Sequence, residues 1–504
     1  MGAAGLDFII VGASISGLSS AITLKSAGHN VLILEKDPQL GGVVRRPSLF
    51  PTPPSVSLFR IPPNGTKILL DWGLEEVMKA HSAPIAGFAA YKYGEGRTPS
   101  PDLLGKNIWD AELSDAARGG YLQFSHAGLV RILYDYALTP IEVDGYTPRV
   151  SVVFGAEVVS IDCDGPSVTL RSGEVHEGHA IIGADGAKGF VRRLLLEEEE
   201  ESPESDVPTG IAAYVAVVPN RLVTKNNLGD IFCGYPGCTV WFGENRGEGL
   251  FGENHDVSIL LYTPDSSQDG SWIEGAEKKL TDVVGPCDKH VQKLVSLAGP
   301  ATCVQLKQTY ELESWISESG KLLAIGDAAR PFSSGTGHPY VVALEDGLFI
   351  GKIFSHTRNA SRVPELLRAF QQHRGPRCSR LRQMEKEYIF QMILPDGDYQ
   401  AGRDAAMRER HAAGRNVLDG DFQQMMEDYE FMYGYEAADD ADEWWMTWGR
   451  YHDSGDASHD SPNGLFNMAF SSFTREVTEK YGSPEAELDN DREFLRGEED
   501  TSYS

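Results

Sequence analysis

Cysteine, long apolar runs and basic residues are all scarce in this sequence of 504 residues. The six cysteines lie at positions 163, 233, 238, 287, 303 and 378, with no C-x-x-C pair and no histidine at zinc-finger spacing beside them. We therefore expect unpaired structural thiols in a reducing compartment, and no metal site. No apolar run is long enough to span a bilayer, and the apolar N-terminal stretch lacks the basic leader of a signal peptide. The expected location is the cytoplasm, without a membrane partner.

The shortage of basic residues sets the charge of the protein. Lys and Arg together number 45 and Asp and Glu 74, which gives a formal net charge of −29. An acidic surface of this kind repels nucleic acid and anionic lipid, so we expect neither as a partner. Hydrophobic residues make up 41% and charged residues 24%, as in ordinary globular proteins. The length allows two or three structural units.

The N-terminal stretch predicts a βαβ unit. Residues 7–11 are apolar and predict a buried strand, and residues 12–17 form a glycine-rich turn. Residues 18–27 predict a helix that ends at Gly28, and residues 31–34 predict a second buried strand. A strand, turn, helix and strand in this order are the parts of a dinucleotide-binding unit.

The remaining sequence predicts further helices and a β-rich segment. Helices are expected over residues 67–80, 126–138, 275–298 and 339–354, a β-meander over 151–170, and strands at 180–182, 211–218, 238–242, 257–262 and 322–325. The run Glu197–Glu201 predicts a solvated loop, which we take as a domain boundary. From residue 363 the pattern is helical and acidic, and Trp444, Trp445 and Trp448 are expected to pack between helices.

The first motif with chemical meaning is the turn Gly12-Ala13-Ser14-Ile15-Ser16-Gly17. Dinucleotide binding requires a tight turn, then a small residue close to the pyrophosphate, then a glycine where helix meets sheet. Gly12 and Gly17 fill the outer roles, and Ser14 adds a hydroxyl at the middle position. Glu35 ends the second strand, where a carboxylate can accept both ribose hydroxyls of adenosine. The pattern predicts a pyrophosphate at the N-terminus of the first helix.

Two further acidic turns follow buried strands. Asp185 lies in Gly183-Ala184-Asp185-Gly186, and Asp327 lies in Ile325-Gly326-Asp327-Ala328. Each is also compatible with an ordinary turn. A carboxylate at the end of a buried strand, as at Asp327, can accept hydrogen bonds from the ribityl hydroxyls of a flavin. Gly335 and Gly337 would let the backbone approach the flavin ring, and the helix that follows would direct backbone donors toward it.

In this order the three motifs resemble those of the single-component FAD-dependent aromatic hydroxylases, and most of all the fungal salicylate-hydroxylase-like branch of these flavoprotein monooxygenases. Ile61-Pro62-Pro63-Asn64, Trp72-Gly73-Leu74 and Leu344-Glu345-Asp346-Gly347 are similar to further segments of that branch. The resemblance covers roughly residues 6–395. It implies FAD bound non-covalently, with NADPH or NADH as co-substrate, O2, and a small aromatic substrate.

The resemblance also assigns residues around the flavin and the substrate. Gly42 lies in Gly41-Gly42-Val43-Val44, where the family has a glycine-rich segment, and His126 stands where the family has a flavin-contacting Arg. A histidine can donate one hydrogen bond there but not two. Arg192 and Tyr214 match the Arg and Tyr that the branch uses to activate substrate. An Arg beside a phenol favours the phenolate, an electron-rich ring that electrophilic oxygen transfer needs. The alternatives are a surface Arg and a core Tyr.

We therefore predict an α/β fold with a doubly wound FAD-binding domain built from residues 1–208 and 318–375. A mostly antiparallel β-sheet substrate domain is expected at 209–317 and a helical C-terminal region at 376–504. The predicted function is an FAD-dependent monooxygenase that hydroxylates a phenol, with oxidative decarboxylation of a hydroxybenzoate as one form of the reaction. The alternatives are a flavin-dependent epoxidase or oxidase of secondary metabolism, and, outside enzymes, a carrier like the prenyl-protein escort proteins.

Overall fold

Five parallel strands form the central sheet of the fold. The computed structural model describes residues 5–41, 58–94, 100–109, 117–201, 206–232, 237–243, 246–250, 256–265, 278–332, 337–419 and 422–452. The sheet has the order β18-β12-β1-β2-β8, and every neighbouring pair is parallel. Its strands are β1 (Asp7–Val11), β2 (Asn30–Glu35), β8 (Val150–Phe154), β12 (Ala180–Gly183) and β18 (Leu322–Ala324). β12 and β18 are buried along their whole length, as expected of strands covered on both faces.

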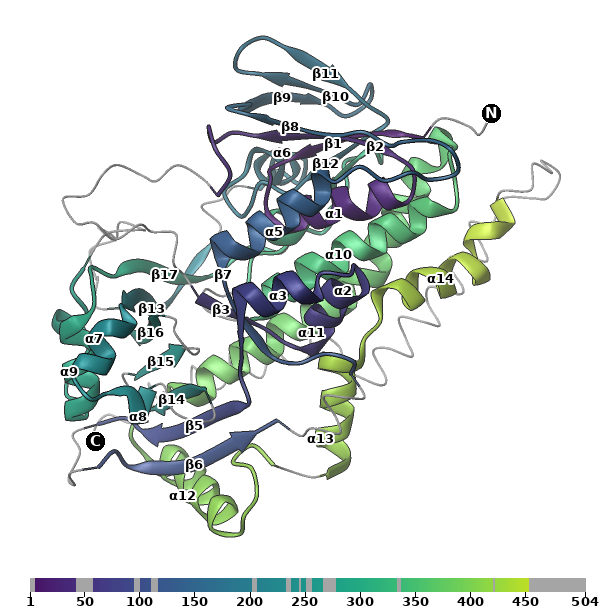
Figure 1. Cartoon of the computed structure of the whole chain (residues 1–504). Helices are drawn as coiled ribbons and strands as arrows, with labels where there is room; N and C mark the ends of the chain where they lie inside the picture. Colours follow the sequence, from purple (N-terminus) through teal and green to yellow (C-terminus); the bar gives the residue numbers. More distant parts are fainter. Residues whose placement is uncertain are drawn as a thin grey trace, which may run out of the picture. The chain divides into compact units, whose positions relative to one another are not determined.

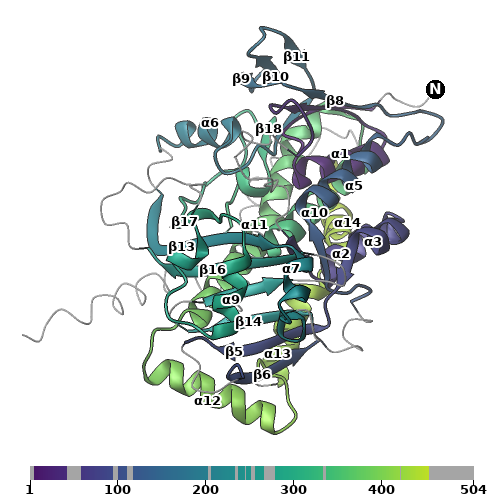
Figure 2. The same ribbon diagram turned by 60° about the vertical axis from the view of Figure 1, so that its left-hand side comes forward.

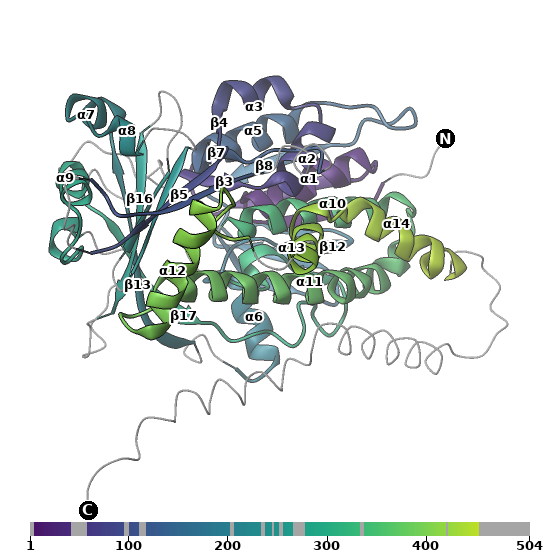
Figure 3. The ribbon, with the colours of Figure 1, turned by 90° about the horizontal axis from the view of Figure 1, so that it is seen from below.

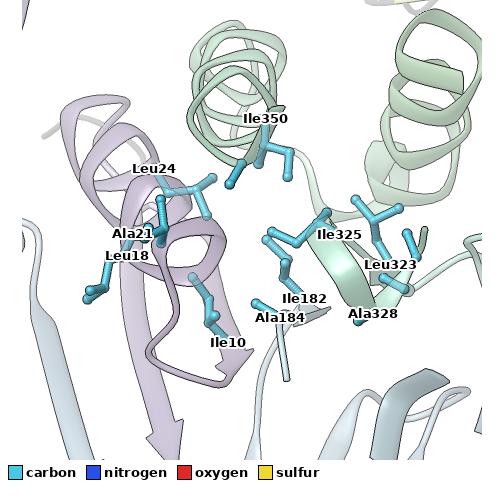
Figure 4. Packing of buried hydrophobic residues seen from close by; sticks show 14 of the residues in the cluster. Ile10, Leu18, Ala21, Leu24, Ile182, Ala184, Leu323, Ile325, Ala328 and Ile350 are labelled. Carbon is cyan, nitrogen blue, oxygen red and sulfur yellow. The ribbon is translucent and has the colours of Figure 1, made fainter. Parts of the chain in front are cut away.

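Helices cover one face of this sheet, and a small antiparallel sheet covers the other (Figure 1). The helices are α1 (Ile15–Ser26), α5 (His126–Leu138) and α10 (His338–Ser355). The small sheet consists of β9 (Val158–Asp162), β10 (Ser167–Leu170) and β11 (Val175–Glu177). Figure 4 shows side chains of α1, α10 and the sheet meeting in one apolar cluster, among them Leu24, Ile350 and Ile182. The predicted α/β class is confirmed, and the doubly wound arrangement stays a prediction.

Close packing of α1 against α10 fixes the position of the first helix. A Cβ atom at Gly347 would lie 2.4 Å from Ser19 Oγ, and one at Gly351 would lie 2.2 Å from Thr23 Cβ. The Ser19 hydroxyl donates a hydrogen bond of 2.8 Å to the carbonyl of Ala343. Glycine on α10 therefore lets the two helix backbones approach, and the N-terminus of α1 is held rigidly at the edge of the sheet.

A second, seven-stranded sheet lies beside this assembly (Figures 2 and 3). Its order is β17-β13-β16-β15-β14-β5-β6, and all pairs are antiparallel except β14 with β5. The strands are β5 (Gly87–Lys92), β6 (Leu103–Ile108), β13 (Val207–Val218), β14 (Cys238–Phe242), β15 (Arg246–Leu250), β16 (Val257–Pro264) and β17 (Thr302–Gln308). Two of them precede residue 209, so the sheet draws on more of the chain than 209–317.

Each face of the seven-stranded sheet packs against different helices. One face packs against α9 (Lys289–Leu297) through residues such as Tyr214 and Leu294. The other packs against the end of α11 (Val363–Met392) through residues such as Tyr262 and Ile389. A third sheet, of order β3-β7-β4, is formed by β3 (Leu58–Ile61), β7 (Leu122–Ser125) and β4 (Ser82–Pro84).

Buried ion pairs connect α10 to α11. Arg374 and Arg377 of α11 both contact the carboxylate of Glu345, and Arg374 Nε lies 3.0 Å from an oxygen of Asp346. Burial opposes ionisation of Glu345, but the Arg377 and Arg374 guanidinium groups lower its pKa to about 2. The acidic signature Leu344-Glu345-Asp346-Gly347 thus holds two core helices together, and removal of one partner would leave a buried charge unpaired.

The remaining helices include α2 (Pro63–Asp71), α3 (Glu75–His81), α6 (Phe190–Glu198), α7 (Asn220–Lys225), α8 (Gly229–Phe232), α12 (Asp398–Ala412), α13 (Phe422–Tyr429) and α14 (Ala437–Thr447). Short helical turns occur at Leu280–Asp282, Gly326–Ala328, Ala360–Arg362, Glu430–Gly434 and Gly449–His452. No helix within the described part of the chain is both long and apolar enough to cross a bilayer.

Several predicted elements differ from the structure in extent. The predicted helix at 67–80 is two helices, because Gly73 between them has a φ of +76° and stops the first one. The helix predicted over 275–298 is confined to α9. Glu197 and Glu198 lie in the last turn of α6 rather than in a loop, and β8, predicted within the meander, joins the central sheet.

Two of the three C-terminal tryptophans pack as expected, whereas Trp448 is exposed. Trp444 is buried in the main core, and Trp445 stacks on His356 with ring centroids 4.5 Å apart. Residues up to Trp445 form one compact unit and Met446–Ser504 a second one. The predicted boundaries at 208, 317 and 375 stay predictions.

Candidate active site

A cavity lies where the parallel strands of the central sheet end. Its volume of about 440 Å³ is within the range of roughly 300–1,000 Å³ that is typical of ligand pockets. The turns after β1, β2, β12 and β18 all line it, together with the first residues of α5 and α10. Ligands of open α/β sheets bind at this edge, because the loops after parallel strands meet there. The cavity is therefore the candidate site.

The glycine-rich turn forms one wall of the cavity. Gly12 has a φ of +104°, and a Cβ atom there would lie 2.6 Å from the carbonyl oxygen of Ala184. A Cβ atom at Gly17 would lie 2.2 Å from the carbonyl oxygen of Gly12. Both glycines are thus required by the turn itself. Ile15 begins α1, and the first N–H groups of a helix have no partner within it, so this wall offers backbone donors to an anion.

Ser14 lines the cavity, but its hydroxyl is used within the protein. It is the N-cap residue of α1 and accepts a hydrogen bond of 3.3 Å from the N–H of Gly17. The same hydroxyl donates to the carbonyl of Ala184 at 2.9 Å. The Ser14 hydroxyl, which was predicted to lie beside a phosphate, therefore stabilises the turn. Only backbone N–H groups of this turn remain to contact a phosphate.

Glu35 lies at the end of β2 and lines the cavity. One carboxylate oxygen accepts a hydrogen bond of 2.8 Å from the N–H of Ala13, and the other accepts one of 2.9 Å from the N–H of Asp37. The side chain thus joins the glycine turn to the turn after β2. Each oxygen keeps a second lone pair, so Glu35 can still accept hydrogen bonds from a ligand.

Asp185 follows β12 and has one carboxylate oxygen in use. Oδ2 accepts a hydrogen bond of 3.1 Å from the N–H of Val191 at the start of α6. Oδ1 is buried and has no hydrogen-bond partner. Burial raises the pKa of Asp185, although the N–H groups of Val191 and Phe190 oppose the shift. An unpartnered buried acceptor on a cavity wall is suited to a ligand that donates a hydrogen bond.

Asp327 lies in the turn after β18 and opens onto the cavity. Its side chain is exposed to the cavity, so the carboxylate is open to a ligand. His126, the first residue of α5, lines the cavity, and burial lowers its pKa. Tyr340 of α10 was not foreseen. It lines the cavity with its ring stacked on Phe59 at 3.8 Å, and burial raises its pKa to about 12.

Two of the predicted glycines lie outside the described residues, namely Gly42 and Gly335. Gly337 is described and is the N-cap residue of α10. A Cβ atom there would lie 3.1 Å from the carbonyl oxygen of Arg60. Gly337 therefore lets β3 pass close to the start of α10 rather than lining the cavity itself.

Comparisons with known proteins agree with this geometry. Residues 10–69 match the family described as an NAD(P)-binding Rossmann-like domain. The chain is 23% identical over 441 residues to an FAD-dependent monooxygenase, OpS4, of Beauveria bassiana, which covers 87% of this chain and 96% of that protein. It is 22% identical over 407 residues to 6-hydroxynicotinate 3-monooxygenase of Bordetella bronchiseptica, and the match covers 78% of this chain and 94% of that protein. The chain is a homologue of the FAD-dependent monooxygenases.

A solved structure of a salicylate hydroxylase with substrate shares the fold. Its TM-score is 0.64 at 15% identity, and the match covers 87% of this chain and 98% of that one. The predicted family, the expectation of an enzyme and FAD as the cofactor are confirmed at the level of these homologues. The individual residue assignments remain predictions.

Arg192, predicted to activate the substrate, does not line the cavity. Its Nη1 donates to the carbonyls of Ala329 at 3.0 Å and Ala328 at 3.4 Å, and Nη2 donates to the carbonyl of Tyr310. Burial lowers the pKa of this guanidinium group. Arg192 therefore holds the turn that carries Asp327, and the neighbouring Arg193 is the one that lines the cavity.

Tyr214, the second predicted catalytic residue of the monooxygenase, lies on β13 within the core beneath α9. It is 3% exposed and does not line the cavity, and burial raises its pKa. Its position agrees with the alternative of a core tyrosine. Alternation along a strand decides which face a side chain occupies, and the sequence alone does not tell which face meets the cofactor.

Glu385 of α11 is a further residue that no sequence motif indicated. Its Oε1 accepts a hydrogen bond of 3.0 Å from the backbone N–H of His338. The same oxygen lies 2.9 Å from the ring Nδ1 of His338. Glu385 thus occupies the N-terminus of α10, where the sequence predicted donors for the flavin ring. The carboxylate comes from a residue 47 positions away along the chain, and no local pattern indicates the contact.

Proposed function

We propose that this chain binds FAD non-covalently and, with NADH or NADPH and O2, hydroxylates a small aromatic substrate. One observation carries the proposal. Three motifs that lie far apart in the sequence, around Gly12, Asp185 and Asp327, line the same cavity. Each motif alone is compatible with an ordinary turn, but a shared cavity is the arrangement that a long dinucleotide needs.

The residues of the cavity fit the parts of FAD. Backbone N–H groups at the start of α1, with Lys36, Lys188 and Arg193 also on the wall, suit the pyrophosphate. Glu35 offers acceptors for the adenosine ribose. The buried Oδ1 of Asp185, which has no partner, would accept a hydrogen bond from a hydroxyl or N–H of the cofactor.

The chemistry that FAD supplies when bound is acceptance of hydride from NADH or NADPH and activation of O2. The protein must position both partners and exclude water. His126 and Tyr340 are held neutral by burial, so each can donate a single hydrogen bond in the cavity without adding charge. Asp327 would orient ribityl hydroxyls, and Arg192 would act indirectly by holding the turn that carries it.

We infer a phenolic substrate, including a hydroxybenzoate that loses its carboxylate in the reaction. The support is that the names of two related proteins, 6-hydroxynicotinate 3-monooxygenase and salicylate hydroxylase, refer to hydroxylated aromatic acids. Oxygen insertion at the carbon that bears the carboxylate would interrupt aromaticity, and loss of carbon dioxide would restore it. The net charge of −29 would not attract such an acid from a distance, so a neutral phenol is the other candidate.

The proposal is tested on the purified full-length protein. We expect a yellow protein that releases FAD on acid denaturation and whose NAD(P)H oxidation is stimulated by phenols. Product analysis with hydroxybenzoates and simple phenols would then locate the inserted oxygen. A colourless protein that does not bind added FAD would refute the cofactor assignment, and turnover of the phenols alone would refute decarboxylation.

A further inference from the structure

Two buried polar groups without partners lie in this region of the fold, one on β7 of the sheet β3-β7-β4 and one directly after β6. Gln123 of β7 is 2% exposed, and neither its amide nitrogen nor its amide oxygen has a hydrogen-bond partner. The indole Nε1 of Trp109 is likewise buried and unpartnered. A buried polar group left unsatisfied costs roughly 1–3 kcal/mol. Groups of this kind therefore indicate that something else binds there.

Strand pairing places Gln123 beside Arg60, and an aromatic contact with Tyr121 brings Trp109 to the same region. Arg60 of β3 and Ala83 of β4 are the direct neighbours of Gln123 across the sheet, so all three side chains emerge on one face. Tyr121 precedes Gln123 by two residues and so lies on the same face. Its ring stacks on that of Trp109 with centroids 4.3 Å apart.

The surroundings favour an anionic oxygen. Tyr121 is hydrogen-bonded to Tyr433, and burial raises the pKa of both phenols, so both are neutral. Arg60 acts electrostatically on both phenols and lowers the pKa of each. Groups that can donate, on Arg60, Gln123 and Trp109, are thus arranged around the ring of Tyr121. A guanidinium with added N–H donors is the usual arrangement for a carboxylate.

This face adjoins the candidate active site through β3. Phe59, which precedes Arg60, points the other way and stacks on Tyr340, a residue of the cavity wall. The carbonyl of Arg60 lies against the start of α10 at Gly337. A ligand held by Gln123 would therefore lie next to the wall that is expected to carry the cofactor.

We propose that Arg60, Gln123 and Trp109 form the subsite that binds the carboxylate of an aromatic acid substrate. This inference rests on the proposed monooxygenase function and adds the substrate class. The net charge of −29 would not attract an anionic acid from a distance. A cation on Arg60 and the two N–H donors would instead favour the acid at close range, within the subsite itself. The alternative occupant of the same groups is an ordered water.

The test compares 2- and 4-hydroxybenzoate with the corresponding hydroxybenzamides, by calorimetric binding and by stimulated NADH and NADPH oxidation in the FAD-loaded protein. The variant Gln123→Leu removes both polar atoms at nearly constant volume, and Trp109→Phe removes only the N–H. We expect each to raise the Kd and KM of the preferred acid tenfold or more, with the amides changed less than twofold. Thr239→Val is the matched control, because its hydroxyl is also buried and unpartnered but lies on β14. It should affect acid and amide alike.

The outcomes separate this subsite from the general function. If the protein holds FAD and oxidises NAD(P)H with phenols, but Gln123→Leu weakens acid and amide equally, the groups bind only water and the subsite is refuted. The same conclusion follows if the wild type prefers the amides. A wild-type protein without FAD would instead refute the proposed function, and calorimetry would still show whether the acid binds and whether Gln123→Leu weakens it.

Discussion

Replacement of Glu35 separates a structural role of this carboxylate from its role toward the cofactor. Its two oxygens accept hydrogen bonds from the N–H groups of Ala13 and Asp37. A hydrogen bond to a charged group contributes roughly 1.5–3 kcal/mol, and the lower value applies to a half-buried side chain. Glu35→Ala should therefore lower the free energy of unfolding of the FAD-free protein by about 2–3 kcal/mol. The glycine turn would lose the hydrogen bond that joins Ala13 to β2, and FAD affinity should fall about ten- to hundredfold.

Glu35→Gln is the more informative variant. From the sequence alone, glutamine retains one acceptor oxygen and should weaken FAD binding less than alanine does. In the structure both oxygens face backbone N–H groups, so the amide of glutamine would place a donor against one of them. We expect glutamine to be nearly as harmful as alanine. Urea unfolding of the FAD-free protein gives the stability, and titration of flavin fluorescence gives the affinity.

A control on the same cavity wall is available at Glu157. Its carboxylate forms an exposed ion pair with Arg171, so Glu157→Gln should change FAD affinity less than threefold. Wild-type stability in Glu35→Gln would refute the two backbone hydrogen bonds as the source of its effect. Wild-type FAD affinity in both Glu35 variants would refute the assignment of this residue to the cofactor.

Three further predictions follow from the cavity. Gly12→Ala should abolish FAD binding, since the added Cβ meets the Ala184 carbonyl at a positive φ; retained FAD in a folded variant would contradict the turn geometry. Asp327 lines the cavity with an exposed side chain, so Asp327→Asn should weaken FAD binding without lowering the stability of the FAD-free protein; an FAD affinity equal to that of the wild type would argue against a contact with the cofactor. His126→Arg should keep or tighten FAD binding and His126→Leu weaken it, as measured by fluorescence titration, and no change in either would show that the residue does not contact the cofactor.

The FAD-binding elements were largely predictable because their signals are local. A run of apolar residues followed by a glycine turn and a helix determines β1, α1 and β2 with small errors at the ends. The placement of Gly12, Glu35, Asp185 and Asp327 around one cavity also followed, because loops after parallel strands meet at one edge of the sheet. The prediction of one helix over 67–80 was wrong because Gly73, with its positive φ, separates two helices there.

The substrate side was not predictable in the same way. Arg192 and Tyr214 have residue types suited to activation of a phenol, yet one is bound to three backbone carbonyls and the other faces the core under α9. Their environment depends on strands and helices at least 75 residues distant in sequence, such as β18 and α9. Glu385 at the start of α10 and the pairing of Arg60 with Gln123 are further contacts between distant segments.

The sequence by itself determined the α/β class, the βαβ unit and the turns that line the cavity, because hydrophobic periodicity and glycine spacing act over a few residues. Tertiary structure decided which hydroxyls and carboxylates remain open to a ligand. Ser14 is used by its own helix and Arg192 by the turn after β18, while Asp185 Oδ1 and Gln123 are left without partners. The physical reason is that burial fixes whether a polar group finds its partner within the protein or must find it in a ligand, and burial is set by packing between distant segments.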